Sequence, residues 1–251
     1  MKLRSGHNLL SRRGNEMAFV PFGIAHVIGI LLSVVMVFVI IHRRQWLRKT
    51  NVDRIARYSL AGLLIGCEVS LYIWYEVTDN WGLHSLPFQL CSIMMWLSAA
   101  LLLTRNHRLY EIGYFLGILG AIQAILTPNL DASYPEFRYF HFFIAHAAII
   151  AASVYMTAVH QHRPKLRSMF RALGWLHVLA LPAAITNWIT GSNFMFLARK
   201  PDTGSLLDLL SPWPWYLLQL ELVAMLLCFM LYGIVWFVDR MSSRMTQATT
   251  P

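Results

Sequence analysis

The chain has 251 residues, of which 57% are hydrophobic and 13% are charged, and its formal net charge is +9. Soluble domains carry about 25% charged residues, so this chain has too few polar side chains to cover a water-facing surface. The composition therefore excludes a soluble protein and predicts an all-α membrane helix bundle. Nucleic-acid binding is not expected, because the basic residues lie between apolar segments, where they fit loops facing anionic lipid headgroups.

The apolar segments predict about seven membrane-spanning helices in a single domain over residues 17–240, each near the roughly 20 residues that a bilayer requires. The expected spans are Phe19 to Ile41, Tyr58 to Glu76, Pro87 to Leu103, Glu111 to Thr127, Arg138 to Val159, Phe170 to Ile189 and Trp215 to Val238. Residues 1–16 form a polar basic N-terminal tail and residues 241–251 a polar C-terminal tail. No cleavable signal peptide is evident, and Met17 is a possible natural start that N-terminal sequencing would test.

The distribution of basic residues predicts the orientation in the membrane. The loops after the first, third and fifth spans and the C-terminal tail carry most of the arginine and lysine. The opposite loops hold only Arg138, Arg199 and Lys200. The positive-inside rule therefore places the N-terminus outside and the C-terminus in the cytoplasm. The basic N-terminal tail disagrees with this orientation, and a start at Met17 would remove the conflict.

The stretch from Leu86 to Trp96 is the centre of the functional interpretation. Pro87 suits the first position of a helix, because its missing N–H has no intrahelical partner there. Cys91 would then lie about 6 Å deeper along the axis. At the same rise, Gln123, Glu221, Glu68 and His146 lie about 7–12 Å from the outer ends of their helices. These five groups share one layer and could line one cavity.

Each of these residues has a functional and a structural reading. A charged Glu68 or Glu221 at mid-bilayer costs at least about 2.5 kcal/mol, so both are functional or paired, or else protonated structural glutamates. Cys91 and His146 could form a nucleophile–base pair, because a thiolate is the reactive form and histidine can accept its proton. The structural alternative is that Cys91 is inert packing, as expected for Cys67 and Cys228.

No metal or cofactor site is expected. His141 and His146 are about 140° apart around a helix, so they do not share a face as paired metal ligands would. Walker, Rossmann, zinc and serine-hydrolase motifs are absent. The long outer loop from Thr190 to Pro214 holds Asn193 with Arg199 and Lys200 nearby, and it either contacts an anionic headgroup or caps the bundle.

Five ordered motifs between residues 60 and 237 give the chain a resemblance to a known family. They are Leu86-Pro87 with Cys91, Thr127-Pro128, Phe143 with His146, Asn193-Phe194-Met195-Phe196-Leu197 with Lys200-Pro201, and Trp213-Pro214-Trp215-Tyr216 with Glu221. Together they resemble the bacterial YwaF-type integral membrane proteins, which are related more distantly to eukaryotic transmembrane protein 164. The resemblance implies a multi-pass protein of the bacterial plasma membrane.

The resemblance also implies a chemistry. The eukaryotic relative is described as a phospholipid acyltransferase that works through a cysteine acyl-thioester, and its cysteine and histidine correspond to Cys91 and His146. This chain departs from the family pattern at Gln89, where histidine is expected in many relatives, and at Phe194, where tyrosine is usual. If a histidine at position 89 assists catalysis in those relatives, this chain lacks it.

The leading hypothesis is therefore a membrane phospholipid acyltransferase or transacylase in which Cys91 attacks a lipid ester and His146 moves the proton. Gln123, Asn187 or Asn193 would stabilise the oxyanion. Glu68 or Glu221 would orient the histidine. No cofactor is required, and membrane phospholipids are the expected partners. The alternatives are a non-catalytic transporter or a protein that binds a lipid or another small molecule, with Glu68, Glu221 and His146 holding an ion or ligand, and a structural membrane subunit.

Overall fold

The fold is all-helical throughout the part of the chain that the computed structural model describes, which is residues 19–130, 132–201 and 204–248. The α-helices are α1 (Ile24–His42), α2 (Arg44–Leu47), α3 (Thr50–Val77), α4 (Leu90–Thr104), α5 (His107–Ile112), α6 (Ile118–Leu126), α7 (Phe137–Ala158), α8 (Leu166–Thr190) and α9 (Trp215–Ala248). Short helical turns are η1 (Leu83–Ser85), η3 (Phe194–Phe196) and η4 (Leu206–Leu209), and η2 (Gly113–Gly117) is a π-helix.

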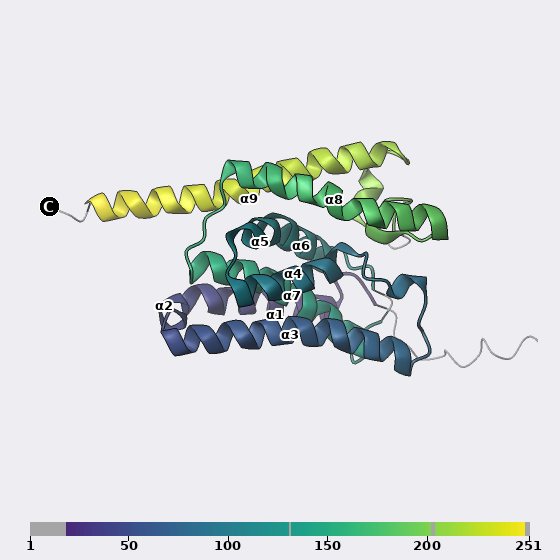
Figure 1. Ribbon diagram of the computed structural model, residues 1–251, viewed down its shortest axis with the longest axis horizontal. Coiled ribbons are helices and arrows are strands. Elements are labelled where there is room, and N and C mark those ends of the chain that lie inside the picture. The colour runs from purple at the N-terminus through teal and green to yellow at the C-terminus, as the bar shows by residue number, and fades with distance from the viewer. Residues whose placement is uncertain (1–18, 131, 202–203, 249–251) are drawn as a thin grey trace, which may run out of the picture.

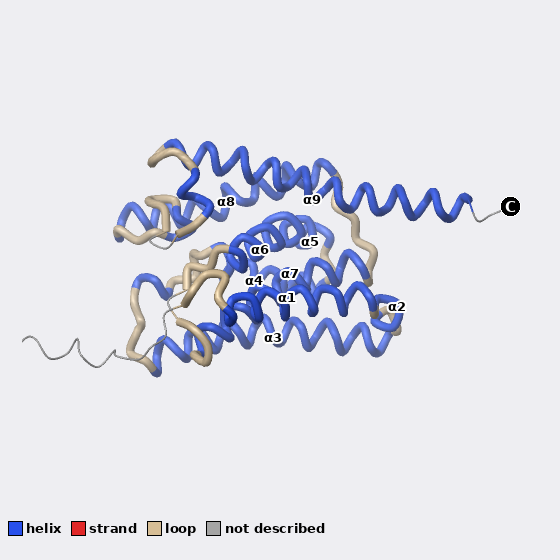
Figure 2. Tube along the Cα trace, turned by 180° about the vertical axis from the view of Figure 1, so that it is seen from behind, coloured by secondary structure: helices blue, strands red, loops and turns tan. Residues whose placement is uncertain are grey.

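Seven helical segments in this part are long and apolar enough to cross a membrane, which confirms the predicted bundle of about seven spans. Figure 1 shows α1, α3, α4 and α7 packed together, with α8 and α9 lying side by side along the opposite edge from α3. Most loops gather at the end of the bundle away from α2, as Figure 2 shows. We call these the loop end and the α2 end. The orientation in the membrane stays a prediction, as do residues 1–16 and a start at Met17, which lie outside the described residues.

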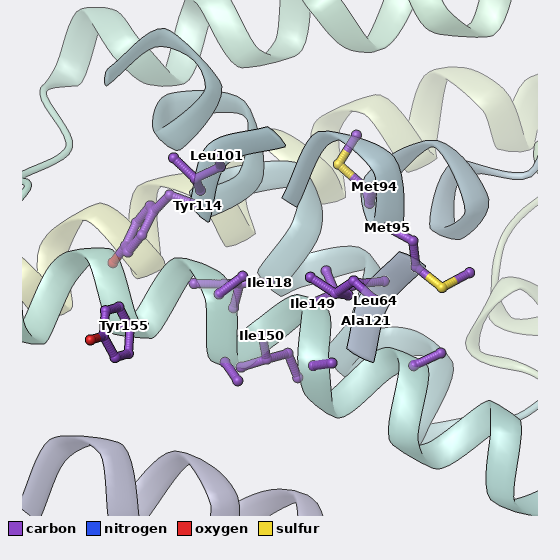
Figure 3. Packing of buried hydrophobic residues seen from close by; sticks show 14 of the residues in the cluster. Leu64, Met94, Met95, Leu101, Tyr114, Ile118, Ala121, Ile149, Ile150 and Tyr155 are labelled. Carbon is purple, nitrogen blue, oxygen red and sulfur yellow. The ribbon is translucent and has the colours of Figure 1, made fainter. Parts of the chain in front are cut away.

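The core of the bundle lies where α7 packs against α3, α4 and α6 (Figure 3). Small residues allow the helices to approach closely. A Cβ added to Gly117 would lie 3.2 Å from Ile149 of α7 and 3.9 Å from the sulfur of Met94 of α4. A Cβ on Gly29 would lie only 2.5 Å from the ring of Phe143, so α1 packs against α7 through this glycine. Such small-residue contacts are typical of helix packing inside membranes.

Several helix boundaries differ from the sequence expectation for physical reasons. The fourth span is interrupted by the π-helix η2, which has glycine at both ends and from which the Tyr114 hydroxyl donates to the Leu231 carbonyl at 3.0 Å. The helix α3 begins at Thr50 rather than Tyr58, and its additional turns carry an ion pair between Asp53 and Arg57. The last helix runs to Ala248, into the segment that we interpreted as a tail.

The prediction that Pro87 opens a helix was wrong. Pro87 lies in a turn between η1 and α4, and α4 begins at Leu90 with Gln89 as its N-cap residue. The Gln89 side chain is not used to cap its own helix. Its Oε1 accepts a hydrogen bond of 3.1 Å from the backbone N–H of Met195, so the start of α4 is tied to the long outer loop. Cys91 is therefore the second residue of the helix and belongs to its first turn.

Candidate functional site

Cys91 lies at the loop end, at the positive end of α4. The first helical bond of α4 runs from Ile93 N–H to the Gln89 carbonyl at 3.2 Å. The structure gives the N–H groups of Leu90, Cys91 and Ser92 no hydrogen-bond partner among the described residues. Unpaired N–H groups in a first turn favour a negative charge nearby. Cys91 is half-buried. The partial positive charge at the start of α4 therefore stabilises its thiolate form more than it would at the deeper position that we expected.

A buried carboxyl group lies on α3, which packs against α4. Glu68 of α3 is only 1% exposed, and its Oε1 accepts a 2.8 Å hydrogen bond from the Tyr72 hydroxyl. Glu68 also interacts with Ser92 of α4, which is the residue after Cys91. The second oxygen, Oε2, is buried without a hydrogen-bond partner among the described residues. We call Glu68, Tyr72, Cys91 and Ser92 the Cys91 cluster.

His146 of α7 is buried, and its tautomer is fixed by the backbone. Its Nδ1 lies 2.6 Å from the Phe142 carbonyl, so Nδ1 carries the proton and donates it. The other ring nitrogen, Nε2, therefore keeps its lone pair and can accept a proton. His141 has the opposite arrangement, because its Nε2 lies 3.1 Å from the Cys67 carbonyl. The two histidines of α7 therefore carry the proton on different ring nitrogens, and each has a different nitrogen free to accept one.

The packing places Cys91 and His146 at the same level of the bundle. The helices α4 and α7 both run from the loop end to the α2 end and pack against one another. Met94 and Ile149 both flank Gly117, so these two residues are level. Cys91 lies three residues before Met94, and His146 lies three residues before Ile149. Each is therefore about 4.5 Å closer to the loop end than that residue. No hydrogen bond joins the thiol to the imidazole within the described residues.

A polar cleft of about 260 Å³ opens at the loop end. The polar side chains of its wall are His84, Gln89, Asn129, Ser192, Asn193 and Arg199. Gln89 is two residues before Cys91, so the cleft adjoins the first turn of α4. The cleft contains both a cation, on Arg199, and several amides that can accept and donate hydrogen bonds.

The two asparagines expected at an oxyanion hold the outer loop together. Asn187 donates to the Phe194 carbonyl at 3.0 Å and accepts from the Phe194 N–H at 2.7 Å. Asn193 donates to the Arg199 carbonyl at 2.9 Å and accepts from the N–H groups of Ala198 and Arg199. Both amides therefore have structural partners, and their proposed catalytic role stays a prediction.

Gln123 bonds within its own helix, and Glu221 lies apart from the Cys91 cluster. The Gln123 amide donates to the Thr127 hydroxyl at 3.0 Å, at the end of α6. Glu221 of α9 faces His177 of α8 at 3.6 Å, and its side chain is 41% exposed. Because α9 and α3 lie on opposite edges of the bundle in Figure 1, Glu221 and Glu68 belong to different parts of the molecule. Nothing in the geometry brings Glu221 to His146.

The α2 end holds a second polar network that the sequence interpretation missed. Asp53 accepts hydrogen bonds from Arg57 at 3.0 Å, from the Tyr155 hydroxyl at 2.9 Å and from His160 at 2.7 Å. Glu111 of α5, 3% exposed, pairs at 2.6 Å with the Ser168 hydroxyl and at 3.0 Å with Arg171. The spacing of Asp53 and Arg57 by four residues was the signal in the sequence, because such pairs meet on one helix face.

No group of three or more histidine, cysteine, aspartate or glutamate side chains among the described residues is arranged to hold a metal ion. The site consists instead of a thiol, a carboxylate, an imidazole with one available nitrogen and a set of unpaired backbone N–H groups. Such a set can form and break an acyl bond or move a proton.

Comparison with known proteins gives one finding. The family model of the TMEM164 family matches residues 21–232, which include the Cys91 cluster, His146 and the outer loop. No curated protein and no solved structure matches the chain. Since the match extends over most of the chain and the helices are those of a multi-pass membrane protein, the chain belongs to the TMEM164 family.

Proposed function

We propose that the protein transfers acyl groups between membrane phospholipids, with Cys91 as the nucleophile. The observation that carries the proposal is the position of Cys91. The thiol belongs to the first turn of α4, in one cluster with the buried Glu68, and Gln89 two residues before it lines the polar cleft. A cysteine that only filled space would have no use for these neighbours.

The reaction begins with attack of the Cys91 sulfur on the carbonyl carbon of a phospholipid ester. The thiol proton passes to Nε2 of His146, which is available because Nδ1–H donates to the Phe142 carbonyl. The tetrahedral intermediate then loses its ester oxygen, which takes the proton from His146, and a lysophospholipid leaves. A hydroxyl of the acceptor lipid attacks the resulting thioester, its proton follows the same route, and the thiol is restored.

The backbone of α4 supports the developing negative charge. The N–H groups of Cys91 and Ser92 have no partner within the described part of the chain, and donors of this kind stabilise an oxyanion when they point to the reacting carbonyl. We assign Glu68 the role of stabilising positive charge that develops in the site, because a buried carboxylate attracts a cation strongly in a low-dielectric interior. The cleft holds the headgroup, and Arg199 on its wall supplies a positive charge for the phosphate.

The test is a transfer assay in lipid nanodiscs. A donor phospholipid with a deuterated acyl chain and a lysophospholipid acceptor are incubated with the purified protein, and lipid mass spectrometry measures the labelled product. We expect transfer by the natural protein and by Cys228→Ala, whose cysteine is buried in α9, and no transfer by Cys91→Ala. Full transfer by Cys91→Ala would end the proposal.

One observation favours a second function, a proton-coupled transporter or lipid carrier. The buried Glu68 oxygen without a partner is a place where a proton or cation could be held inside the bundle. This reading requires no reactive thiol. It predicts proton or solute flux in liposomes that continues after the thiols are blocked with N-ethylmaleimide and stops in Glu68→Gln.

A further inference from the structure

The α2 end contains a second cleft whose chemistry the acyl-transfer proposal does not use. It has a volume of about 260 Å³ and is lined by Arg48, Thr50, Asp53, Arg105, Val159 and His160. These residues come from the start of α3, the end of α4, the end of α7 and the segment between α2 and α3. The cleft therefore lies where three helices long enough to span a membrane begin or end.

The single carboxylate on this wall is already neutralised. Asp53 accepts bonds from Arg57, His160 and the Tyr155 hydroxyl, which use both of its oxygens. Arg48 is held in place by bonds of 3.1 Å and 2.9 Å to the carbonyls of Val159 and Ala158, at the end of α7. With Asp53 paired, the arginines leave the cleft with a net positive charge.

Arg105 is the feature that most needs an explanation. It follows the last residue of α4 with φ 56° and ψ 26°, the left-handed conformation that glycine adopts at this position in many helices. A side chain in this conformation is strained. The guanidinium is exposed, and the structure gives it no partner among the described residues. An arginine held at some cost, facing a cleft and without a partner, indicates a ligand for its charge.

The start of α3 adds donors to the same cleft. The N-cap residue Lys49 makes no side-chain capping bond, and the first helical bond of α3 runs from Asp53 N–H to the Lys49 carbonyl at 2.8 Å. Thr50, the first residue of this long helix, lies on the cleft wall. Unpaired N–H groups at a helix start favour a bound anion, in agreement with the charge of Arg48 and Arg105.

We propose that this cleft binds one phosphate group, held by Arg105, Arg48 and the start of α3. The expected source is the headgroup of an anionic phospholipid, because the cleft lies at the ends of three candidate spans and basic clefts between spans recognise such headgroups. A free phosphate compound has the same chemistry and is the other source that the test distinguishes. The site is separate from the Cys91 cluster, which is near the opposite end of the same helix α4.

Native mass spectrometry of the full chain in detergent tests the site. The protein is titrated with phosphatidylglycerol or with phosphatidylcholine of the same acyl chains, and inorganic phosphate is added as a competitor. We expect one phosphatidylglycerol to bind at least fivefold more tightly than phosphatidylcholine. Displacement of the bound lipid by millimolar phosphate would identify a soluble phosphate compound as the source while still supporting the site.

Three variants separate a specific site from general attraction to basic loops. Arg105→Gln should weaken phosphatidylglycerol binding at least fivefold, whereas Arg108→Gln, which removes an exposed arginine outside the cleft, should leave it unchanged. Arg105→Gly should abolish selective binding and also raise or maintain the melting temperature, because glycine adopts this conformation without strain. Equal losses in the 105 and 108 variants, or no preference for the anionic lipid in the natural protein, would overturn the proposal.

Discussion

The two ends of the bundle hold clefts of equal volume but different chemistry. At the loop end, the Cys91 cluster has a buried carboxyl oxygen and first-turn N–H groups beside a thiol, and these polar groups have no partner among the residues that the structure describes. At the α2 end, the two carboxylates Asp53 and Glu111 are each satisfied by several donors. Incompletely paired polar groups cost stability and are retained where they serve a reaction or a ligand, whereas saturated networks hold helices together. The comparison of the carboxylates therefore assigns acyl transfer to the loop end and helix anchoring to Asp53 and Glu111 at the α2 end, beside the proposed phosphate cleft.

The largest expected effect on the rate of acyl transfer comes from removal of the base at the loop end. Replacement of His146 by alanine should lower the rate of acyl transfer by about 10²-fold or more, in the range measured for general bases. The matched control is His141→Ala on the same helix, since the Nε2 of His141 is already bonded to the Cys67 carbonyl. Transfer rates per folded protein in nanodiscs measure both variants. Similar rates for the two would remove His146 from the mechanism.

Glu68 should have a smaller effect on the same reaction. Glu68→Gln keeps an acceptor for the Tyr72 hydroxyl but removes the charge, so we expect about a tenfold slower transfer with little change in melting temperature. Glu68→Asp, which restores the charge, should recover part of the rate. A melting temperature that falls while the transfer rate holds would assign Glu68 a structural role instead.

At the α2 end, the expected loss is one of stability. Glu111→Ala removes the partner of Ser168 and Arg171, and the loss of these bonds should lower the free energy of unfolding by about 1–3 kcal/mol. Thermal unfolding in detergent measures this change. Transfer per folded protein should stay within about twofold, because the reacting groups are at the opposite end. A large loss of transfer without a loss of stability would contradict the division between the two ends.

The smallest expected effect is on how the melting temperature depends on pH, through a histidine at the α2 end. Burial, followed by the neighbouring His107 and His160, holds the pKa of His162 below its usual range. Below about pH 6.5 the unfolded chain therefore binds this proton before the folded chain does, so stability is lost as the pH falls towards the folded-state pKa. His162→Phe keeps the edge contact with Tyr110 and should reduce the drop in melting temperature between pH 7.5 and 5.5. His42→Phe, at an exposed position, should leave the drop unchanged.

The spans could be predicted from the sequence because a bilayer imposes its thickness on apolar runs. Arg138 to Val159 was expected and α7 runs from Phe137 to Ala158, since the segment has no internal interruption. The start of α4 could not be predicted in this way. Pro87 is acceptable at the first position of a helix, but Gln89 is bonded to the Met195 N–H, over a hundred residues away, and the helix starts after it.

Part of the candidate site could also be predicted, because polar residues are conspicuous within apolar spans. Cys91, Glu68 and His146 could be identified as unusual residues within apolar spans, and the association of Glu68 with Cys91 depends on how α3 packs against α4. Glu221 had the same signal in the sequence, yet α9 lies along α8 and this glutamate faces His177. The presence of ionisable and thiol groups within the spans was therefore readable from the sequence, whereas the depth of Cys91 and the direction in which each helix faces depended on contacts distant in the chain.

The most direct test of the chemistry assigned to the loop end is the covalent state of Cys91. Intact-mass spectrometry of the detergent-purified protein, incubated with mixed phospholipids, would be compared with Cys91→Ala and repeated after neutral hydroxylamine. We predict an acyl adduct in the natural protein that hydroxylamine removes and that Cys91→Ala lacks, as a thioester intermediate requires. Absence of any adduct in the natural protein, or an equal adduct in Cys91→Ala, would contradict the account and favour a binding or transport function for the buried carboxylate.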